Sequence, residues 1–181
     1  MAKKKILLLS DDLRMSSGVG TMSREFVLAT IDKYDWVQVA GAIDHPEKGK
    51  VVDMNKAMRE ESGVEDAKLK IYPVSGYGDQ KLLRQLIDIE KPDVLFPQSS
   101  AEVITLSKNK DILEKTGVKV LISSEEAVYK SENKAELYKT LENTPVKIPN
   151  FKIVNSLDDF LEAVEALGYP SIPVCFKPPI S

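Results

Sequence analysis

The hydrophobic positions of the first two thirds of this chain fall into two alternating patterns. One is a short, continuous apolar run, which is typical of a strand buried on both faces of a sheet. The other places apolar residues three and four positions apart, as in an amphipathic helix. We expect strands over residues 5–10, 36–43, 69–74, 93–96 and 118–122. This alternation predicts the α/β class, with a Rossmann-like parallel five-strand sheet.

Helix signals occupy the segments between and after these strands. Asp79 and Ser156 stand where N-caps belong, and Asp159 completes a capping box after Ser156. Gly117 and Gly168 stand where helices end. We expect one helix to begin after Asp79, and others over residues 21–34, 52–61, 100–115, 126–141 and 157–167.

The pattern changes after Ser123, where a long helix signal is followed by prolines and short extended pieces. We expect strands over residues 151–154 and 174–177 there. The apolar stripe of the helix over 157–167 would need such strands, because the helix alone gains about as much from burial as ordering costs. The sequence therefore predicts two domains, a Rossmann-like one over residues 1–123 and an α+β one over 124–181.

Composition narrows the classes of partner and location. The chain has 25 Lys and Arg against 28 Asp and Glu, a net charge of −3, so we expect neither nucleic acid nor a membrane as partner. The apolar run at Ile6–Leu9 is too short for a signal peptide, and no stretch reaches the roughly 20 apolar residues of a membrane span. One cysteine, Cys175, fits a reducing, cytoplasmic location. One cysteine and one histidine, His45, exclude a Cys/His zinc site.

A polar loop with two glycines joins the first strand to the first helix. Gly18 and Gly20 would let a phosphate approach the backbone N–H groups at the start of that helix. Residue 23 is serine, so the six-position dinucleotide fingerprint is incomplete. Phosphate binding at Gly18 and Gly20 and ordinary turn chemistry both stay open.

This loop also resembles a known family. Residues 10–12 followed by 17–25 look like the start of a GT-B type glycosyltransferase, and the likeness continues through 36–43 and 76–79 to about residue 93. The resemblance implies that residues 1–93 form the N-terminal domain of such an enzyme, with Gly18 and Gly20 near sugar or phosphate. The partner would then be a nucleotide-sugar, although most of that donor site lies in a domain this chain does not contain.

The C-terminal half resembles a second family. Residues 97–102, 107–110 and 117–123 look like the end of the domain that precedes an ATP-grasp fold of carbamoyl-phosphate-synthase-like members. Asn133-Lys134 is similar to that family's (Asp/Asn)-Lys helix. The segments 145–149, 157–170 and 174–178 match its proline connector, its helix and turn, and its Lys-Pro strand. This likeness covers about residues 94–181.

The second resemblance implies a nucleotide site. Carried over by position, Lys134 and Lys177 would reach the phosphates of ATP, the role to which a lysine point charge is suited. Without the resemblance, Lys177 reads as an edge-strand lysine that extends into water. The family's glycine-rich loop and its magnesium ligands have no counterpart here, so the subdomain is expected to be truncated and the chain inactive alone. Glu102, Glu125 and Glu126 are expected to be solvated or capping carboxylates, and His45 a loop residue.

The leading hypothesis is therefore the N-terminal fragment of an ATP-grasp ligase, which activates a carboxylate through an acyl phosphate with ATP and magnesium. The alternatives are the N-terminal domain of a GT-B glycosyltransferase and a non-catalytic Rossmann-like module. The expected partner is a nucleotide or nucleotide-sugar. A homo-oligomer, or a partner that supplies the missing domain, is also expected.

Overall fold

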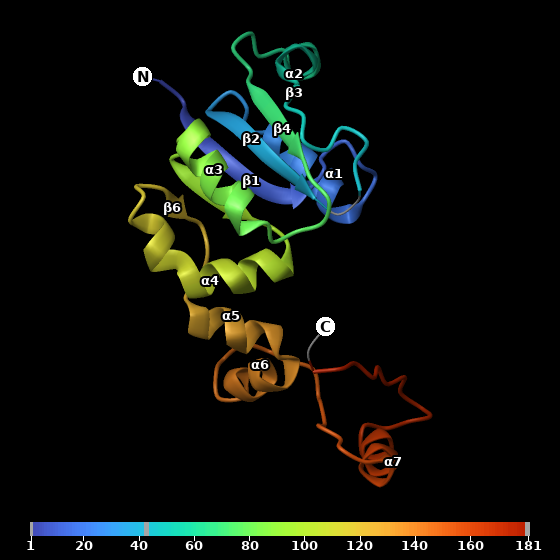
Figure 1. Cartoon of the computed structure of the whole chain (residues 1–181). Coiled ribbons are helices and arrows are strands. Elements are labelled where there is room, and N and C mark those ends of the chain that lie inside the picture. The colour runs from blue at the N-terminus through green and yellow to red at the C-terminus, as the bar shows by residue number, and fades with distance from the viewer. Residues whose placement is uncertain (1, 42–43, 180–181) are drawn as a thin grey trace. The chain divides into compact units, whose positions relative to one another are not determined.

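The computed structural model of the chain describes residues 2–41 and 44–179 (Figure 1). It consists of two compact units, Met1–Ser124 and Glu125–Ser181, which are described in turn. Residues 42–43, predicted to end the second strand, lie outside the described residues.

The first unit is built on a six-stranded sheet with the order β3-β4-β2-β1-β5-β6. Five of the strands run parallel, which confirms the predicted α/β class and the five strands expected from the apolar runs. These strands are β1 (Lys4–Asp11), β2 (Tyr34–Gly41), β4 (Leu69–Pro73), β5 (Val94–Pro97) and β6 (Lys119–Val120). The sheet is thus Rossmann-like, with β1 at its centre.

The sixth strand was not expected. β3 (Val52–Asp53) pairs antiparallel with β4 at the sheet edge, and it occupies the start of the segment predicted to be helical. The helix begins later, as α2 (Asn55–Ser62). The main-chain N–H of Met54 donates to the carbonyl oxygen of Leu69 at 2.9 Å, so pairing with β4 holds this segment extended up to the start of the helix.

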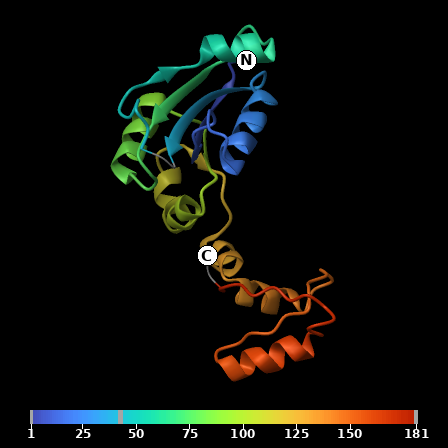
Figure 2. The ribbon, with the colours of Figure 1, turned by 90° about the vertical axis from the view of Figure 1, so that its right-hand side faces the viewer.

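Helices cover both faces of the sheet. Figure 2 shows α1 (Gly18–Leu28) and α3 (Gln80–Glu90) on opposite sides of the strands. Buried side chains place α2 on the side of α1, and α4 (Ser100–Glu114) on the side of α3. The chain changes face after β4, when it crosses to β5 on the far side of β1. The carboxyl ends of β1 and β5 are therefore a topological switch point, where open α/β sheets bind ligands.

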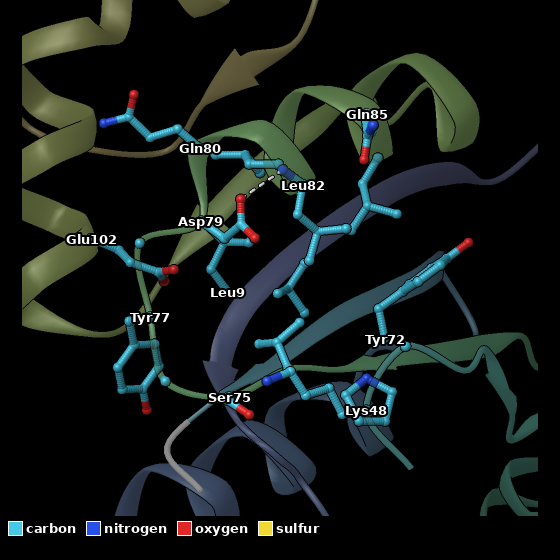
Figure 3. Close-up of a pocket in the computed structure, with 18 of the residues that line it drawn as sticks. Leu9, Lys48, Tyr72, Ser75, Tyr77, Asp79, Gln80, Leu82, Gln85 and Glu102 are labelled. Carbon is cyan, nitrogen blue, oxygen red and sulfur yellow. Dashed lines mark hydrogen bonds between the residues drawn. The ribbon is translucent and has the colours of Figure 1, made fainter. Parts of the chain in front are cut away.

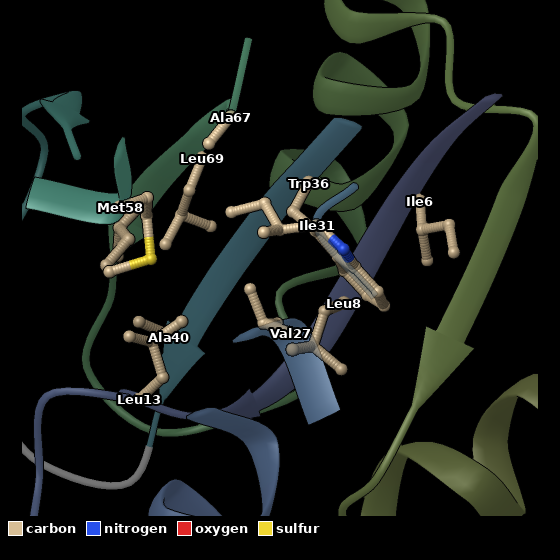
Figure 4. Packing of buried hydrophobic residues seen from close by; sticks show 11 residues of the cluster. Ile6, Leu8, Leu13, Val27, Ile31, Trp36, Ala40, Met58, Ala67 and Leu69 are labelled. Carbon is tan, nitrogen blue, oxygen red and sulfur yellow. The ribbon is translucent and has the colours of Figure 1, made fainter. Parts of the chain in front are cut away.

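The alternating side chains of β1 explain why this strand is central. Ile6 and Leu8 pack into the cluster under α1 and α2, which Figure 4 shows together with Val27 and Trp36. Leu7 and Leu9 pack into the cluster under α3 and α4. The continuous apolar run is thus required because both faces of β1 are buried.

A buried carboxylate ties α3 to the strands. Glu90, whose side chain is 3% exposed, accepts hydrogen bonds from Lys5 Nζ at 3.1 Å, Lys70 Nζ at 2.9 Å and the Tyr72 hydroxyl at 2.7 Å. Lys5 Nζ also donates to the carbonyl oxygen of Glu90 at 2.7 Å, at the carboxyl end of α3. Burial on its own would raise the pKa of Glu90, but the hydrogen bonds from Tyr72, Lys70 and Lys5 outweigh it and lower the pKa to about 2.

The second unit contains three helices and extended connections: α5 (Glu125–Glu132), α6 (Lys134–Leu141) and α7 (Leu157–Ala166). The single helix predicted over 126–141 is wrong. The side chain of Asn133 caps a new helix by accepting hydrogen bonds from the N–H groups of Ala135 and Glu136, and this divides the segment in two. The cap predicted at Ser156 is confirmed by its hydrogen bond from the N–H of Asp159 at 3.0 Å.

The strands predicted over 151–154 and 174–177 do not form in the described residues. Both segments are extended, but neither forms a ladder with the other or with a third segment. A strand is stable only where a neighbour satisfies its backbone N–H and C=O groups. The α+β character expected of this unit is therefore absent from its described part.

We expect Glu90→Gln to destabilise the first unit at neutral pH by about 1–3 kcal/mol, since it weakens charged hydrogen bonds in a buried site. The folded pKa lies below the ordinary value of 4.5, so the stabilisation is complete above that pH and is lost as the pH falls towards about 2. Urea unfolding of both proteins at pH 7, 4 and 2.5 measures this. A difference that does not shrink with acidification would contradict it.

Candidate functional site

The carboxyl end of β1 carries the densest group of buried polar side chains in the first unit. Ser10 and Asp12 are 0% and 1% exposed, and Gln38 of the neighbouring strand β2 is 0% exposed. The Gln38 side-chain amide donates to Ser10 Oγ and to the carbonyl oxygen of Asp11, both at 2.7 Å. Because these residues lie at the switch point of the sheet, they form the floor of the candidate site.

Asp12 is held in a charged network. Arg14 donates to both of its carboxylate oxygens, at 2.9 Å from Nε and 2.7 Å from a terminal nitrogen, and to Glu47 at 2.8 Å. His45 lies on the same network, 3.1 Å from Arg14 and 3.7 Å from Asp12. Burial raises the pKa of Asp12, but the hydrogen bonds from Arg14 outweigh it and hold the pKa below its usual range. The guanidinium is thus occupied by the chain's own carboxylates.

The glycine loop leads into α1. Ser17 caps the helix by accepting from the N–H of Gly20 at 2.9 Å, and it donates to the carboxylate of Asp11 at 2.6 Å. A Cβ on Gly20 would lie 2.8 Å from the carbonyl oxygen of Asp12, whereas a Cβ on Gly18 would meet nothing within 4 Å. Gly20 is therefore required by the turn, and a carboxylate of the chain lies beside the start of the helix.

Tyr77 closes the loop between β4 and α3 over this edge. Its hydroxyl donates to Asp11, and its ring lies so close to Gly41 that a Cβ there would be 2.6 Å from a ring carbon. Burial is the main reason that the pKa of Tyr77 is raised, followed by the hydrogen bond to Asp11. The absence of a side chain at Gly41 is what lets the tyrosine reach β1.

A pocket of about 450 Å³ lies under this loop, between α3, α4 and the sheet (Figure 3). Its apolar wall combines strand residues and helix residues, including Leu9, Val39, Leu82, Leu83 and Leu106. Its polar groups include Glu102 of α4, Asp79 and Lys48. Glu102 was predicted to be solvated or capping; it is only 9% exposed, burial raises the pKa of its carboxyl, and it shares hydrogen bonds with Ser99 at the start of α4, so the capping position is the one it occupies.

The two lysines expected to bind nucleotide lie in the second unit. Lys134 is the first residue of α6, and its main-chain N–H donates to the carbonyl oxygen of Pro179 at 2.8 Å. Lys177 is exposed and stands two residues before Pro179. The hydrogen bond therefore brings the segment that carries Lys177 to the start of the helix that carries Lys134. Lys177 does not lie in a strand, because the strand predicted over 174–177 is not formed.

The structure thus joins some candidate residues and separates others. Gly18 and Gly20 share one loop with Asp11, while in the other unit the hydrogen bond from Lys134 to Pro179 joins the segments that carry Lys134 and Lys177. Neither Tyr77 nor Glu102 was predicted to be a site residue. The position of Glu102 could have indicated a site role, because the residue follows the fourth predicted strand, at the edge of the sheet where ligands bind.

The described residues contain neither a metal-binding cluster nor a membrane-spanning helix. No group of three or more His, Cys, Asp or Glu side chains in that part of the chain is placed to hold a metal ion. None of its helices is long and apolar enough to cross a membrane.

Comparison with known proteins identifies one group of curated relatives. The chain matches no family model. It is 31% identical over 96 residues to the N-terminal section of the carbamoyl phosphate synthase large chain of Aquifex aeolicus, an alignment of 50% of this chain with 17% of that protein. It is 29% identical over 96 residues to the large chain of Thermotoga maritima, covering 51% of this chain and 9% of the relative. The chain therefore spans less than a fifth of these relatives.

Solved structures show the same class of fold. An ADP complex of N5-carboxyaminoimidazole ribonucleotide synthetase matches with a TM-score of 0.53 and 17% identity, over 93% of this chain and 36% of that one. Rhizobium etli pyruvate carboxylase matches with a TM-score of 0.50 and 15% identity, over 94% of this chain and 14% of the carboxylase chain. These likenesses show the fold, and together with the curated relatives they confirm the predicted carbamoyl-phosphate-synthase-like, ATP-grasp resemblance. The GT-B resemblance stays a prediction.

The two glycines of the loop give a matched test. We expect Gly20→Ala to destabilise the first unit by about 1–3 kcal/mol, the usual cost of forcing atoms into a packed site. Gly18→Ala has open space, and we expect its effect to stay within about 1 kcal/mol, with a gain in stability from the lower entropy of the unfolded chain. Chemical unfolding of both variants measures the difference. Equal effects of the two substitutions would contradict the assigned packing of Gly20.

Proposed function

We propose that this chain is the nucleotide-binding N-terminal portion of an ATP-grasp ligase, which uses ATP to activate a carboxylate as an acyl phosphate. The observation that carries the proposal is the similarity to carbamoyl phosphate synthase large chains over half of the chain. The likeness of the fold to ATP-grasp enzymes supports it.

Lys134 and Lys177 are the proposed phosphate-binding residues. The contact between Lys134 and Pro179 supports this role, because it keeps the two lysine-bearing segments together at the amino end of α6. In the described part of the chain neither ammonium group forms an ion pair, so both are free to meet phosphate oxygens. A lysine provides the compact positive charge that polyphosphate attracts.

ATP-grasp enzymes use magnesium with ATP, but the described residues do not supply a cluster of ligands for it. We therefore assign no magnesium ligand in this chain and derive no step through the ion.

The loop of Gly18 and Gly20 suits a sugar hydroxyl better than a phosphate. The carboxylate of Asp11, which accepts from Ser17 and Tyr77, would repel a phosphate there and would attract hydroxyl donors. This favours the sugar of a nucleotide-sugar over its phosphates, in line with the glycosyltransferase alternative. Phosphate binding at Gly18 and Gly20 stays a prediction.

A further polypeptide segment is proposed to cover the second unit. The second unit exposes several apolar side chains: Leu157 is 71% exposed, Phe176 71% and Leu161 55%. An apolar helix face without a sheet to pack on is typical of an interaction surface. We propose that the remainder of an ATP-grasp domain, from the same polypeptide or another chain, supplies the sheet; self-association of this chain is the alternative.

Calorimetric titration of the whole chain with MgATP tests the nucleotide proposal. We expect measurable binding, and we expect Lys134→Ala and Lys177→Ala each to weaken it at least tenfold, which is about 1.4 kcal/mol. Lys152→Ala serves as the control, because Lys152 is an exposed lysine of the same unit.

Three outcomes of the titration would contradict the proposal. If the folded chain does not bind MgATP at millimolar concentration, the proposal is wrong. If Lys152→Ala weakens binding as much as Lys177→Ala, the effect is general charge attraction and the assigned site is wrong. If a nucleotide-sugar binds and ATP does not, the glycosyltransferase alternative is supported instead.

A further inference from the structure

The pocket under the loop of residues 74–79 is lined entirely by residues of the first unit, whereas the proposed phosphate-binding lysines belong to the second. Its volume of about 450 Å³ is that of a small-molecule site. Apolar side chains from the strands and from α3 form most of its wall, as Figure 3 shows for Leu9 and Leu82. Such a wall suits a ligand with an apolar body.

One buried carboxyl group faces this apolar wall. Glu102 lines the pocket and is 9% exposed, although an isolated carboxylate is costly to bury. In the described part of the chain it forms no ion pair. Hydrogen bonds from Gly78 and Ser99 lower the pKa of its carboxyl group. The dominant effect on Glu102 is burial, which raises its pKa.

The helix cap uses only part of the acceptor capacity of this carboxyl group. Ser99 and Glu102 stand in capping-box positions at the start of α4, but their two hydrogen bonds are long, at 3.3 and 3.4 Å. The main-chain N–H of Gly78 also donates to the carboxylate. A carboxylate offers about four acceptor sites. Glu102 therefore has acceptor capacity left on the side of the pocket.

The other charged side chains at the pocket do not form an ion pair with Glu102 in the described residues. Asp79 caps α3 by accepting from the N–H of Leu82 at 2.9 Å, as Figure 3 shows. Two lysines, Lys48 and Lys50, also line the pocket, but both are exposed and screened by solvent, and Lys48 lies 3.9 Å from Asp44. The buried end of the pocket is thus rich in acceptors, and it disfavours an anion.

We propose that this pocket binds a small molecule with an apolar body and a hydrogen-bond-donating end, an amine or a hydroxyl, which Glu102 accepts. The apolar body lies against Leu82, Leu83 and Leu106, and Tyr77 closes the pocket above it. The site stands on the first unit alone, so its test does not depend on ATP binding by the second.

The test uses three probes of matched size that differ in one end: 2-phenylethylamine, 2-phenylethanol and phenylacetate. Amide chemical shifts of the whole labelled chain are followed by NMR during titration. We expect the amine and the alcohol to shift the amides of Gly78 and of the first turns of α3 and α4 saturably. We expect phenylacetate to bind at least tenfold more weakly than the amine.

Variants separate the two parts of the proposed site. Glu102→Gln keeps the size of the side chain but removes its charge, and we expect it to weaken the amine at least tenfold and the alcohol less than threefold. Asp111→Asn is the control, because Asp111 is an exposed carboxylate of the same helix. Leu83→Trp fills the pocket, and we expect it to abolish binding of all three probes while the remaining amides keep their dispersion.

Three results would overturn the proposal. One is the absence of saturable shifts at Gly78 and the starts of α3 and α4 with the amine and the alcohol. Another is binding of phenylacetate as tight as that of the amine. The third is amine binding that Glu102→Gln leaves unchanged, or that a folded Leu83→Trp chain retains.

Discussion

The burial of β1 on both faces is the constraint on which the first unit depends. Leu7 and Leu9 face one layer of helices, and Ile6 and Leu8 face the other, so the strand has no side open to water. Any polar group at its carboxyl end must therefore find a partner inside the protein. Ser10, Asp11 and Asp12 meet this requirement by hydrogen bonds with β2, the glycine loop and Arg14.

Two close approaches make this edge compact. Gly20 lets the turn after β1 fold back on the carbonyl of Asp12, and Gly41 lets Tyr77 cross from the next loop to Asp11. With Tyr77 in place, the 74–79 loop covers the end of the sheet and its Gly78 N–H reaches Glu102. The burial of Glu102 is thus a consequence of packing around β1.

This sequence of causes explains what could be predicted. The five parallel strands could be predicted, because a continuous apolar run fits a strand that is covered on both faces. The division of the predicted helix at Asn133 could not be predicted. An asparagine is compatible with a helix interior, and only the structure shows that its side chain caps α6. The absence of strands over 151–154 and 174–177 could not be predicted, because a strand depends on a partner strand, which the local sequence does not reveal. The cap position of Glu102 could be predicted but its burial could not, because Gly78, whose N–H meets the carboxylate, lies on a loop distant in sequence.

The sign of charge separates the two candidate binding regions. At the sheet edge the positive charge of Arg14 is taken by Asp12 and Glu47, which leaves Asp11 and Glu102 as acceptors for donors on a ligand. In the second unit Lys134 and Lys177 carry positive charge without an acidic partner in the described residues. The two proposed sites therefore offer a ligand opposite charges: acceptors for a hydrogen-bond donor at the sheet edge, and positive charge for a polyphosphate in the second unit.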